Sequence, residues 1–328
     1  MNEQTDRNEQ TRLSDFLDWW IETVIKGNVR RNTYTAYRGY IDNHIKRLLG
    51  NNRLKELTPA AIQQFVHTLC TEERGLAAKT VRVVASMLSG ALECAAGYGY
   101  IPKNPCVKMR LPKAAEKEVE VFTQDEQSRI EYAVERSEDA RTLGIVICLY
   151  TGLRLGELCG LRWENIDFEN KFITVRKSLN RAENKGGGRN KTVMLEQEPK
   201  TANAKRIIPL PDFLREMLKK AKSESNGPPV ISMKNGRYVN PRTLQILYAK
   251  LLKTAGVPHC KFHTTRHTFA TRAIEIGMDI KSVSEILGHA NATITINRYV
   301  HSLTEQKIKG MRMLNAYFRD KKAADSMS

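Results

Sequence analysis

The sequence predicts a mainly α-helical protein with a small β-sheet (an α+β class), divided into two domains. Apolar residues recur at helical spacing through the first hundred residues. Only two short runs further along, residues 172–175 and 206–210, have the composition of strands. A charged segment without large apolar side chains, residues 113–120, separates the two regions. The length of 328 residues is enough for two domains, each with its own core.

Four helices are predicted in the first domain, residues 1–110, which is therefore expected to be a compact bundle. Gly50 is a good C-terminal stop for the second helix. Thr58 and Pro59 form a strong start for the third, because the threonine oxygen can cap the helix and proline fits its first turn. The helices are expected at residues 13–25, about 33–49, from Pro59 onward and about 78–96.

The second domain, residues 121–328, is predicted to follow a linker at 111–120. Thr123 and Glu126 form a capping-box pattern that begins a helix. Residues 143–152 are apolar on all sides and are expected to form a buried helix in this domain's core. Beyond them we expect strands at 172–175 and 206–210, a flexible hairpin extension or loop at the glycine-rich 181–191, and helices from about 241 onward.

The charge of the chain favours a polyanionic partner. The formal charge is +17 and the sequence pI is about 9.6. Residues 1–110 hold 16 basic and 11 acidic side chains and the rest hold 37 and 25, so both halves are basic. Nucleic acid is the most common partner of such a protein, ahead of an acidic protein partner. Both halves are therefore candidates for DNA contact.

The cysteines and the N-terminus exclude several other classes. The six cysteines are scattered and form no CxxC pair, so neither a disulfide framework nor a zinc site is predicted. The polar N-terminus has no features of a signal peptide, and no apolar run approaches the roughly 20 residues of a membrane span. We therefore expect a cytoplasmic protein with reduced thiols, and the predicted contact with DNA implies association with the nucleoid.

Basic residues gather at the starts of two helices in the first domain. Arg30 and Arg31 precede the second helix, and Lys79 and Arg82 open the fourth. The exposed N–H groups of a helix start add to the attraction of such side chains for backbone phosphates. These four residues are predicted DNA contacts, with solvated surface charge as the alternative for each.

Two arginines and a histidine further along have the chemistry to hold one phosphate. Phosphodiester cleavage places negative charge on non-bridging oxygens, and a guanidinium fork stabilises that charge well. Arg154 follows Gly152 at a turn into a helix, and Arg266 follows His263 at i,i+3 spacing, on one helical face. Arg154 could instead be a structural partner of Glu157. We expect both in part, with Glu157 holding the helix.

Two more histidines and a tyrosine complete the set of reactive side chains. His267 is interpreted as a packed or supporting histidine. His289 follows a glycine and is expected at a turn, and Tyr299 lies ten residues further on. A phenol has an ordinary pKa near 10 and by default is a core or rim side chain. It becomes a useful nucleophile where cations stabilise the phenolate and a base takes its proton.

Four segments together resemble the signature blocks of the tyrosine recombinase (phage integrase) family. In chain order they are TGLRLGELCGLRWENID, PKTANAKRIIPL, HTTRHTFATRAIEIG and SVSEILGHANATITINRYVH. Each is weak alone, but their order across roughly residues 120–305 is specific. The helical first domain resembles the family's core-binding (SAM-like) domain, so the resemblance covers nearly the whole chain. It implies that the two domains close around duplex DNA as a C-shaped clamp.

The resemblance also implies a mechanism in which the tyrosine attacks the scissile phosphate and forms a 3′-phosphotyrosyl link. The covalent bond conserves the phosphodiester energy, so neither ATP nor a metal is required and no cofactor is expected. The family's general acid is a lysine on a β-hairpin. Lys200 matches it better than Lys205, because the family's lysine precedes a turn that precedes the strand. The implied catalytic residues are Arg154, Lys200, His263, Arg266, His289 and Tyr299, the last as nucleophile.

Recombination of this kind implies a homo-tetramer on two double-stranded DNA sites, a Holliday-junction intermediate, and possible use of an accessory DNA-bending or excisionase factor. The spacing from His289 to Tyr299 is one residue longer than in many members and resembles integrases of conjugative transposons and prophages. We therefore expect a mobile-element integrase. The alternatives are a cellular Xer-type recombinase that resolves chromosome or plasmid dimers, and a non-catalytic DNA-binding factor.

The two ends of the chain carry two further expectations. Only about a dozen residues precede the first helix, so the arm-binding domain of the family's larger integrases is expected to be absent or removed. Residues 303–318 fit a C-terminal helix with several large apolar side chains. The family implies that this helix docks on a neighbouring protomer, and packing on its own domain is the alternative.

Overall fold

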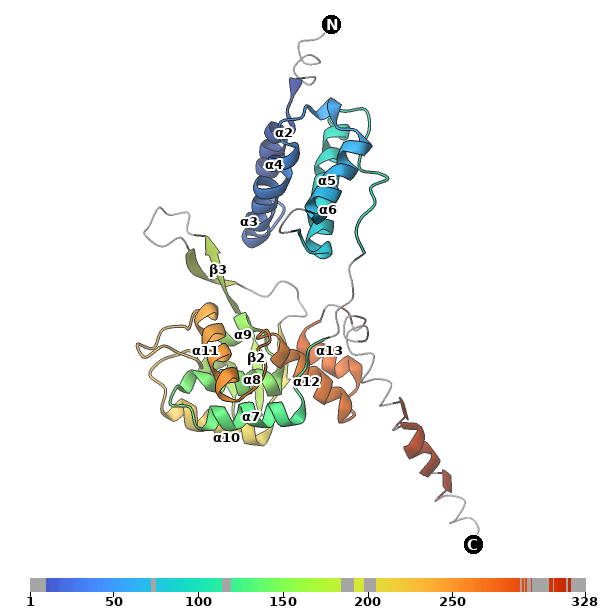
Figure 1. Cartoon of the computed structure of the whole chain (residues 1–328). Coiled ribbons are helices and arrows are strands. Elements are labelled where there is room, and N and C mark those ends of the chain that lie inside the picture. The colour runs from blue at the N-terminus through green and yellow to red at the C-terminus, as the bar shows by residue number, and fades with distance from the viewer. Residues whose placement is uncertain are drawn as a thin grey trace. The chain divides into compact units, whose positions relative to one another are not determined.

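The chain forms two compact units, residues 1–117 and 118–328, each with its own buried apolar cluster (Figure 1). The part of the chain that the structure describes is mainly helical with small antiparallel sheets, as the sequence predicts. This computed structural model describes residues 10–71, 75–113, 119–183, 192–197, 205–289, 291, 293 and 296, and near the C-terminus 307, 308, 310–316, 318 and 319.

The first unit is a bundle of helices, which confirms the prediction for this region. Thr58 caps α5 as expected, since its Oγ1 accepts a hydrogen bond from the backbone N–H of Ala61 at 3.2 Å. Phe16, Ile41 and Phe65 lie in its core. The elements are α2 (Leu13–Trp20), η1 (Ile21–Ile25), α3 (Arg31–Tyr40), η2 (Ile41–Ile45), α4 (Lys46–Leu49), η3 (Leu54–Glu56), α5 (Pro59–Thr71) and α6 (Ala78–Gly97).

The helices of the second unit begin with the predicted capping box. Thr123 Oγ1 accepts from the N–H of Glu126 at 3.1 Å, and the Glu126 carboxylate accepts from the N–H of Thr123 at 2.8 Å. The next long helix, α8, is buried along almost its whole length, as predicted. The helices are α7 (Gln124–Glu135), η4 (Ala140–Thr142), α8 (Leu143–Thr151), α9 (Leu155–Cys159), η5 (Trp163–Asn165), α10 (Asp212–Ser223), α11 (Pro241–Thr254), α12 (Thr264–Glu275) and α13 (Ile280–Leu287).

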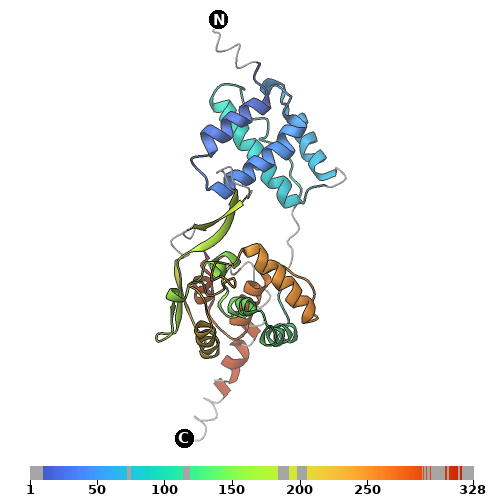
Figure 2. The ribbon, with the colours of Figure 1, turned by 90° about the vertical axis from the view of Figure 1, so that its left-hand side faces the viewer.

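Two small antiparallel sheets follow α9 in the chain. The three-stranded sheet has the order β1–β2–β5, with Ile173 opposite Ile208, and contains both predicted strands. Of the segment predicted as a hairpin extension or loop, residues 181–183 are described and form the end of β3, which pairs with β4 in a hairpin that projects from the helices of its unit (Figure 2). Residues 184–191 lie outside the described residues. The strands are β1 (Ile166–Asp167), β2 (Phe172–Val175), β3 (Ser178–Glu183), β4 (Thr192–Gln197) and β5 (Arg206–Pro209).

Gly152 ends α8 and allows it to meet α12 and α13 closely. Its φ of +63° lies in the left-handed region that favours glycine. A Cβ at this position would come within 2.7 Å of both Leu287 Cδ2 and Phe269 Cδ1. Glycine therefore holds the turn before Arg154 against α12, which carries Arg266, and against the end of α13, which His289 follows.

Candidate active site

Arg154 lies at the N-cap of α9, immediately after the turn at the end of α8. Its backbone N–H donates to Glu157 Oε2 at 2.9 Å, and its Nη1 donates to Glu157 Oε1 at 2.8 Å. Nη2 donates to the carbonyl of Gly288 at 3.2 Å. The side chain of Arg154 is nevertheless 38% exposed. Arg154 thus pairs with Glu157, and its guanidinium is still accessible to solvent.

Arg266 lies in the first turn of α12 and is only 1% exposed. Its Nη1 donates to the carbonyl of Gly152 at 2.7 Å, and its Nη2 donates to the carbonyl of Leu287 at 2.6 Å. These two carbonyls belong to the C-terminal ends of α8 and α13, where a helix leaves acceptors without partners inside the helix. Arg266 therefore joins three helices at one point.

The three histidines lie at the ends or in the first turn of helices. His263 is the exposed N-cap residue of α12, one turn before Arg266. Its ring meets the ring of His267 edge to face, with 4.6 Å between centroids. His289 follows Gly288 at the end of α13, is half-buried, and donates its backbone N–H to the carbonyl of Ser284 at 3.0 Å. Arg154, Arg266 and His289 thus meet at the end of α13.

Two of the six candidate catalytic residues, Lys200 and Tyr299, lie outside the described residues. The alternative general acid, Lys205, is exposed and directly precedes Arg206 on β5. Tyr317 of the expected C-terminal helix also lies outside. Apolar side chains described in that helix are exposed, namely Ile308, Met311, Met313, Leu314 and Phe318.

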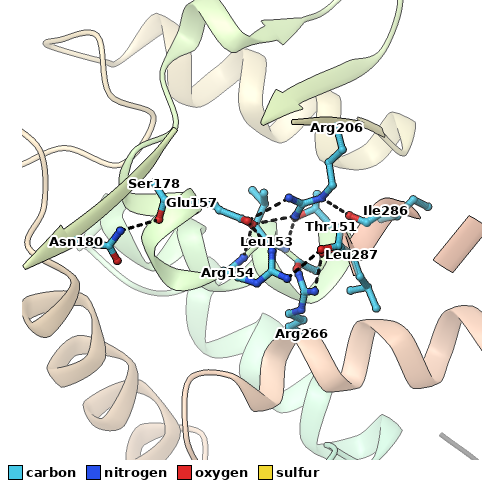
Figure 3. Close-up of polar contacts among 12 residues, drawn as sticks. Thr151, Leu153, Arg154, Glu157, Ser178, Asn180, Arg206, Arg266, Ile286 and Leu287 are labelled. Carbon is cyan, nitrogen blue, oxygen red and sulfur yellow. Dashed lines mark hydrogen bonds and ion pairs between the residues drawn. The ribbon is translucent and has the colours of Figure 1, made fainter. Parts of the chain in front are cut away.

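Arg206, which was not predicted from the sequence, reaches Glu157 and the end of α13 beside Arg154 and Arg266 (Figure 3). Its Nη1 and Nη2 donate to the two carboxylate oxygens of Glu157 at 3.1 and 2.9 Å, and both side chains are 5% exposed. Its Nε donates to the carbonyl of Ile286. A signal was present in the sequence, because strand alternation places Arg206 on the same face as the buried Ile208.

Glu157 is expected to make the protein sensitive to acid. Burial raises the pKa of this carboxyl, but the hydrogen bonds and charge of Arg206, helped by Arg154, outweigh burial and lower the pKa from 4.5 to about 2. Since the folded pKa is below the unfolded one, Glu157 stabilises the fold above about pH 4.5, and this stabilisation is lost as pH falls towards 2. The difference corresponds to about 3 kcal/mol.

Urea unfolding from pH 5 to pH 3 measures this contribution. The wild type should lose more unfolding free energy across this range than Glu157→Gln, which has no carboxyl to titrate. Equal losses in the two proteins would contradict an ionised, arginine-paired Glu157.

The predicted DNA contacts of the first unit lie at the starts of α3 and α6. Arg30 is the exposed N-cap residue of α3, and Arg31 is half-buried beside it. Lys79 and Arg82 are exposed in the first turns of α6, where Arg82 Nε donates to the carbonyl of Pro112 at 3.1 Å. Arg82 therefore also ties down the segment that follows the bundle.

The described part of the chain contains neither a metal-binding cluster nor a membrane-spanning helix. No group of three or more histidine, cysteine or acidic side chains there is arranged to hold a metal ion. None of the helices described has the length and apolar character needed to cross a membrane.

The charge of the chain and the geometry of the candidate site together indicate a class of protein. A basic chain with a helical unit, and with two guanidiniums and a histidine gathered at one helix end, has the features of a nucleic-acid-processing enzyme. A model of the phage integrase family matches residues 120–306, more than half of the chain. A model of the phage integrase N-terminal SAM-like domain matches residues 12–70.

The chain therefore belongs to the phage integrase family of tyrosine recombinases, site-specific enzymes that cleave and rejoin DNA through a tyrosine intermediate. The tyrosine recombinase XerC-like protein of Caldanaerobacter subterraneus subsp. tengcongensis is 32% identical over 335 residues, which cover 94% of this chain and 84% of the relative. The transposase from transposon Tn916 of Enterococcus faecalis is 25% identical over 311 residues, 88% of this chain and 74% of the relative.

Solved structures show the same fold. The Tn1549 transposon integrase in complex with a circular intermediate DNA has a TM-score of 0.78 at 24% identity, covering 92% of this chain and 99% of that one. The lambda integrase tetramer bound to a Holliday junction has a TM-score of 0.67 at 22% identity, covering 89% and 82%. These likenesses support the predicted fold class, a helical SAM-like domain followed by a recombinase domain.

Proposed function

We propose that this recombinase is the integrase of a mobile genetic element and that Arg154, Arg266 and His289 hold the scissile phosphate. The observation that carries the assignment is the meeting of these residues at the C-terminal end of α13. The similarity to the transposase of Tn916 and to the fold of the Tn1549 integrase supports the mobile-element role.

In the proposed reaction the phenol oxygen of Tyr299 bonds to phosphorus while the bond from phosphorus to the 5′-oxygen breaks. The leaving 5′-oxygen takes a proton from Lys200, and His263 acts as base or hydrogen-bond partner. Arg154 and Arg266 stabilise the charge on the non-bridging oxygens. The reverse reaction, with a 5′-hydroxyl from a second site, exchanges the strands.

The domains have separate proposed tasks. Residues 1–110 form the core-binding domain, in which Arg30, Arg31, Lys79 and Arg82 contact backbone phosphates, and a linker at 111–120 leads to the catalytic domain, 121–328. The active assembly is a homo-tetramer on two DNA sites, a proposal supported by the lambda integrase tetramer on a Holliday junction. We also propose that the recombinase works with accessory DNA-bending or excisionase factors. Its proposed location is the cytoplasm, in association with the nucleoid.

A cellular recombinase that resolves chromosome or plasmid dimers is the second candidate. The XerC-like relative, at 32% identity, favours it. The chemistry is the same in both functions, and only the DNA sites differ. Recombination of plasmids carrying the ends of the surrounding element, compared with plasmids carrying a chromosomal dimer site, distinguishes the two candidates.

The test of the chemistry is capture of the covalent intermediate on a nicked duplex taken from the ends of the element. The nick releases a short 5′-hydroxyl strand after cleavage, so the adduct accumulates. We expect a band that resists denaturation, disappears with protease and forms equally in EDTA. Trypsin should leave the nucleotide on the peptide of residues 299–307. Tight binding of the duplex without any adduct would favour the non-catalytic DNA-binding factor.

A further inference from the structure

Three successive carbonyls at the C-terminal end of α13 each accept a hydrogen bond from a different arginine. The arginines come from β5, α12 and the start of α9, elements far apart in the sequence. A helix C-terminus carries partial negative charge and carbonyls without partners inside the helix, so cations bind well there. The pairs are Arg206 Nε with Ile286, Arg266 Nη2 with Leu287, and Arg154 Nη2 with Gly288.

Unlike the other two arginines in its geometry, Arg206 donates from both Nη atoms to the carboxylate of Glu157, which also orients Arg154. Both oxygens of Glu157 accept from Arg206, and the same two oxygens accept from the backbone N–H and Nη1 of Arg154. A continuous series of contacts therefore runs from β5 through Glu157 to the candidate phosphate-binding guanidinium (Figure 3). Only a planar fork can serve two carboxylate oxygens and a carbonyl at once.

We propose that Arg206 is a positioning residue for DNA cleavage, which fixes the Glu157 carboxylate and the end of α13 and thereby places Arg154 and His289 at the scissile phosphate. The inference rests on the proposed role of Arg154 and His289. Arg206 itself is buried and acts through its neighbours.

Stability alone is a weak explanation for this arrangement. A buried ion pair generally gives little net stability compared with apolar side chains of similar volume. An apolar side chain is compatible with the buried face of β5, since Ile208 on the same face packs in the core of the unit. A guanidinium at 206 adds geometric definition at the site, and a misplacement of about 1 Å there can cost about 10²-fold in rate.

The experiment compares Arg206→Gln and Arg206→Lys with the wild type in single-turnover cleavage of two nicked duplexes. One carries the normal scissile phosphate and the other a methylphosphonate, which lacks one non-bridging charge and so depends less on the arginine clamp. On the phosphate we expect both variants to cleave about 10²-fold more slowly than wild type. On the methylphosphonate the deficit should shrink to less than about tenfold.

Two variants run beside them as controls. Arg272→Gln removes an arginine that is likewise held between a carboxylate, Glu275 at 2.6 Å, and a carbonyl, that of Phe122 at 2.7 Å, outside the candidate site. It should show no difference between the two substrates. Arg154→Ala should show the same recovery on the methylphosphonate as the Arg206 variants.

Each result has a defined consequence. Because both substrates are cleaved by the same preparation, the ratio of their rates does not depend on how much of a variant is folded. If the cleavage deficit of Arg154→Ala shrinks on the methylphosphonate and that of the Arg206 variants does not, the positioning role of Arg206 is overturned. The proposed binding of the phosphate by Arg154 then still stands. If Arg154→Ala does not recover, the assignment of Arg154 to the phosphate fails, and this proposal fails with it. Wild-type rates in both Arg206 variants would also overturn it.

Discussion

Tyr299→Phe is expected to bind the crossover-site duplex as tightly as the wild type and to form no covalent adduct. The substitution removes one oxygen, the proposed nucleophile, and leaves the aromatic ring in place. Loss of an attacking group costs on the order of 10⁴-fold or more in rate, so the adduct band should be undetectable. A denaturing gel of protein with the nicked duplex measures the adduct, and a native gel of the same samples measures binding.

The matched control is Tyr132→Phe, which removes a phenol oxygen from an exposed tyrosine of α7 in the same unit. It should form the adduct at the wild-type rate. An adduct that persists in Tyr299→Phe would show that another side chain attacks the phosphate, and the nucleotide-bearing peptide would identify it. Loss of DNA binding in Tyr299→Phe would show that this tyrosine serves the fold or the interface and would leave the nucleophile unassigned.

The sequence was most informative where structure depends on neighbours in the chain. The cap at Thr58, the capping box at Thr123 and the buried helix at residues 143–152 each depend on fewer than a dozen consecutive residues. Hydrogen bonds of a helix start and the burial of an all-apolar helix follow from such local patterns. The i,i+3 pair of Arg154 and Glu157 could be predicted for the same reason.

The contacts that build the candidate site are of another kind. Arg206 and Glu157 are 49 residues apart in the chain, and Arg266 reaches a carbonyl 114 residues away. No periodicity in the sequence encodes such contacts, because they depend on how β5 packs against α9 and how α12 packs against the end of α8. Two neighbouring isoleucines also obscure the inward face of β5, since Ile208 is buried but Ile207 is 58% exposed.

Arg266→Lys is expected to slow single-turnover cleavage by about 10²- to 10³-fold while leaving DNA affinity nearly unchanged. Lysine keeps the positive charge but cannot donate in two directions from a planar fork, so it cannot hold both the phosphate and the helix ends. The carbonyls of Gly152 and Leu287 now accept from Arg266 at 2.7 and 2.6 Å. Leaving one of them without a donor costs about 1–3 kcal/mol, which should also lower the melting temperature.

Stability and chemistry are separated by measuring the rate per folded molecule, with Arg272→Lys as the control on the same helix. Arg272 also donates to a carboxylate and a carbonyl, so its replacement should lower the melting temperature with little effect on that rate. If Arg266→Lys lowers only the melting temperature, Arg266 is a structural tie between α8, α12 and α13, and Arg154 is left as the single arginine at the phosphate. If Arg266 binds the phosphate, Arg266→Lys must cleave more slowly than the wild type even when the same fraction of both proteins is folded.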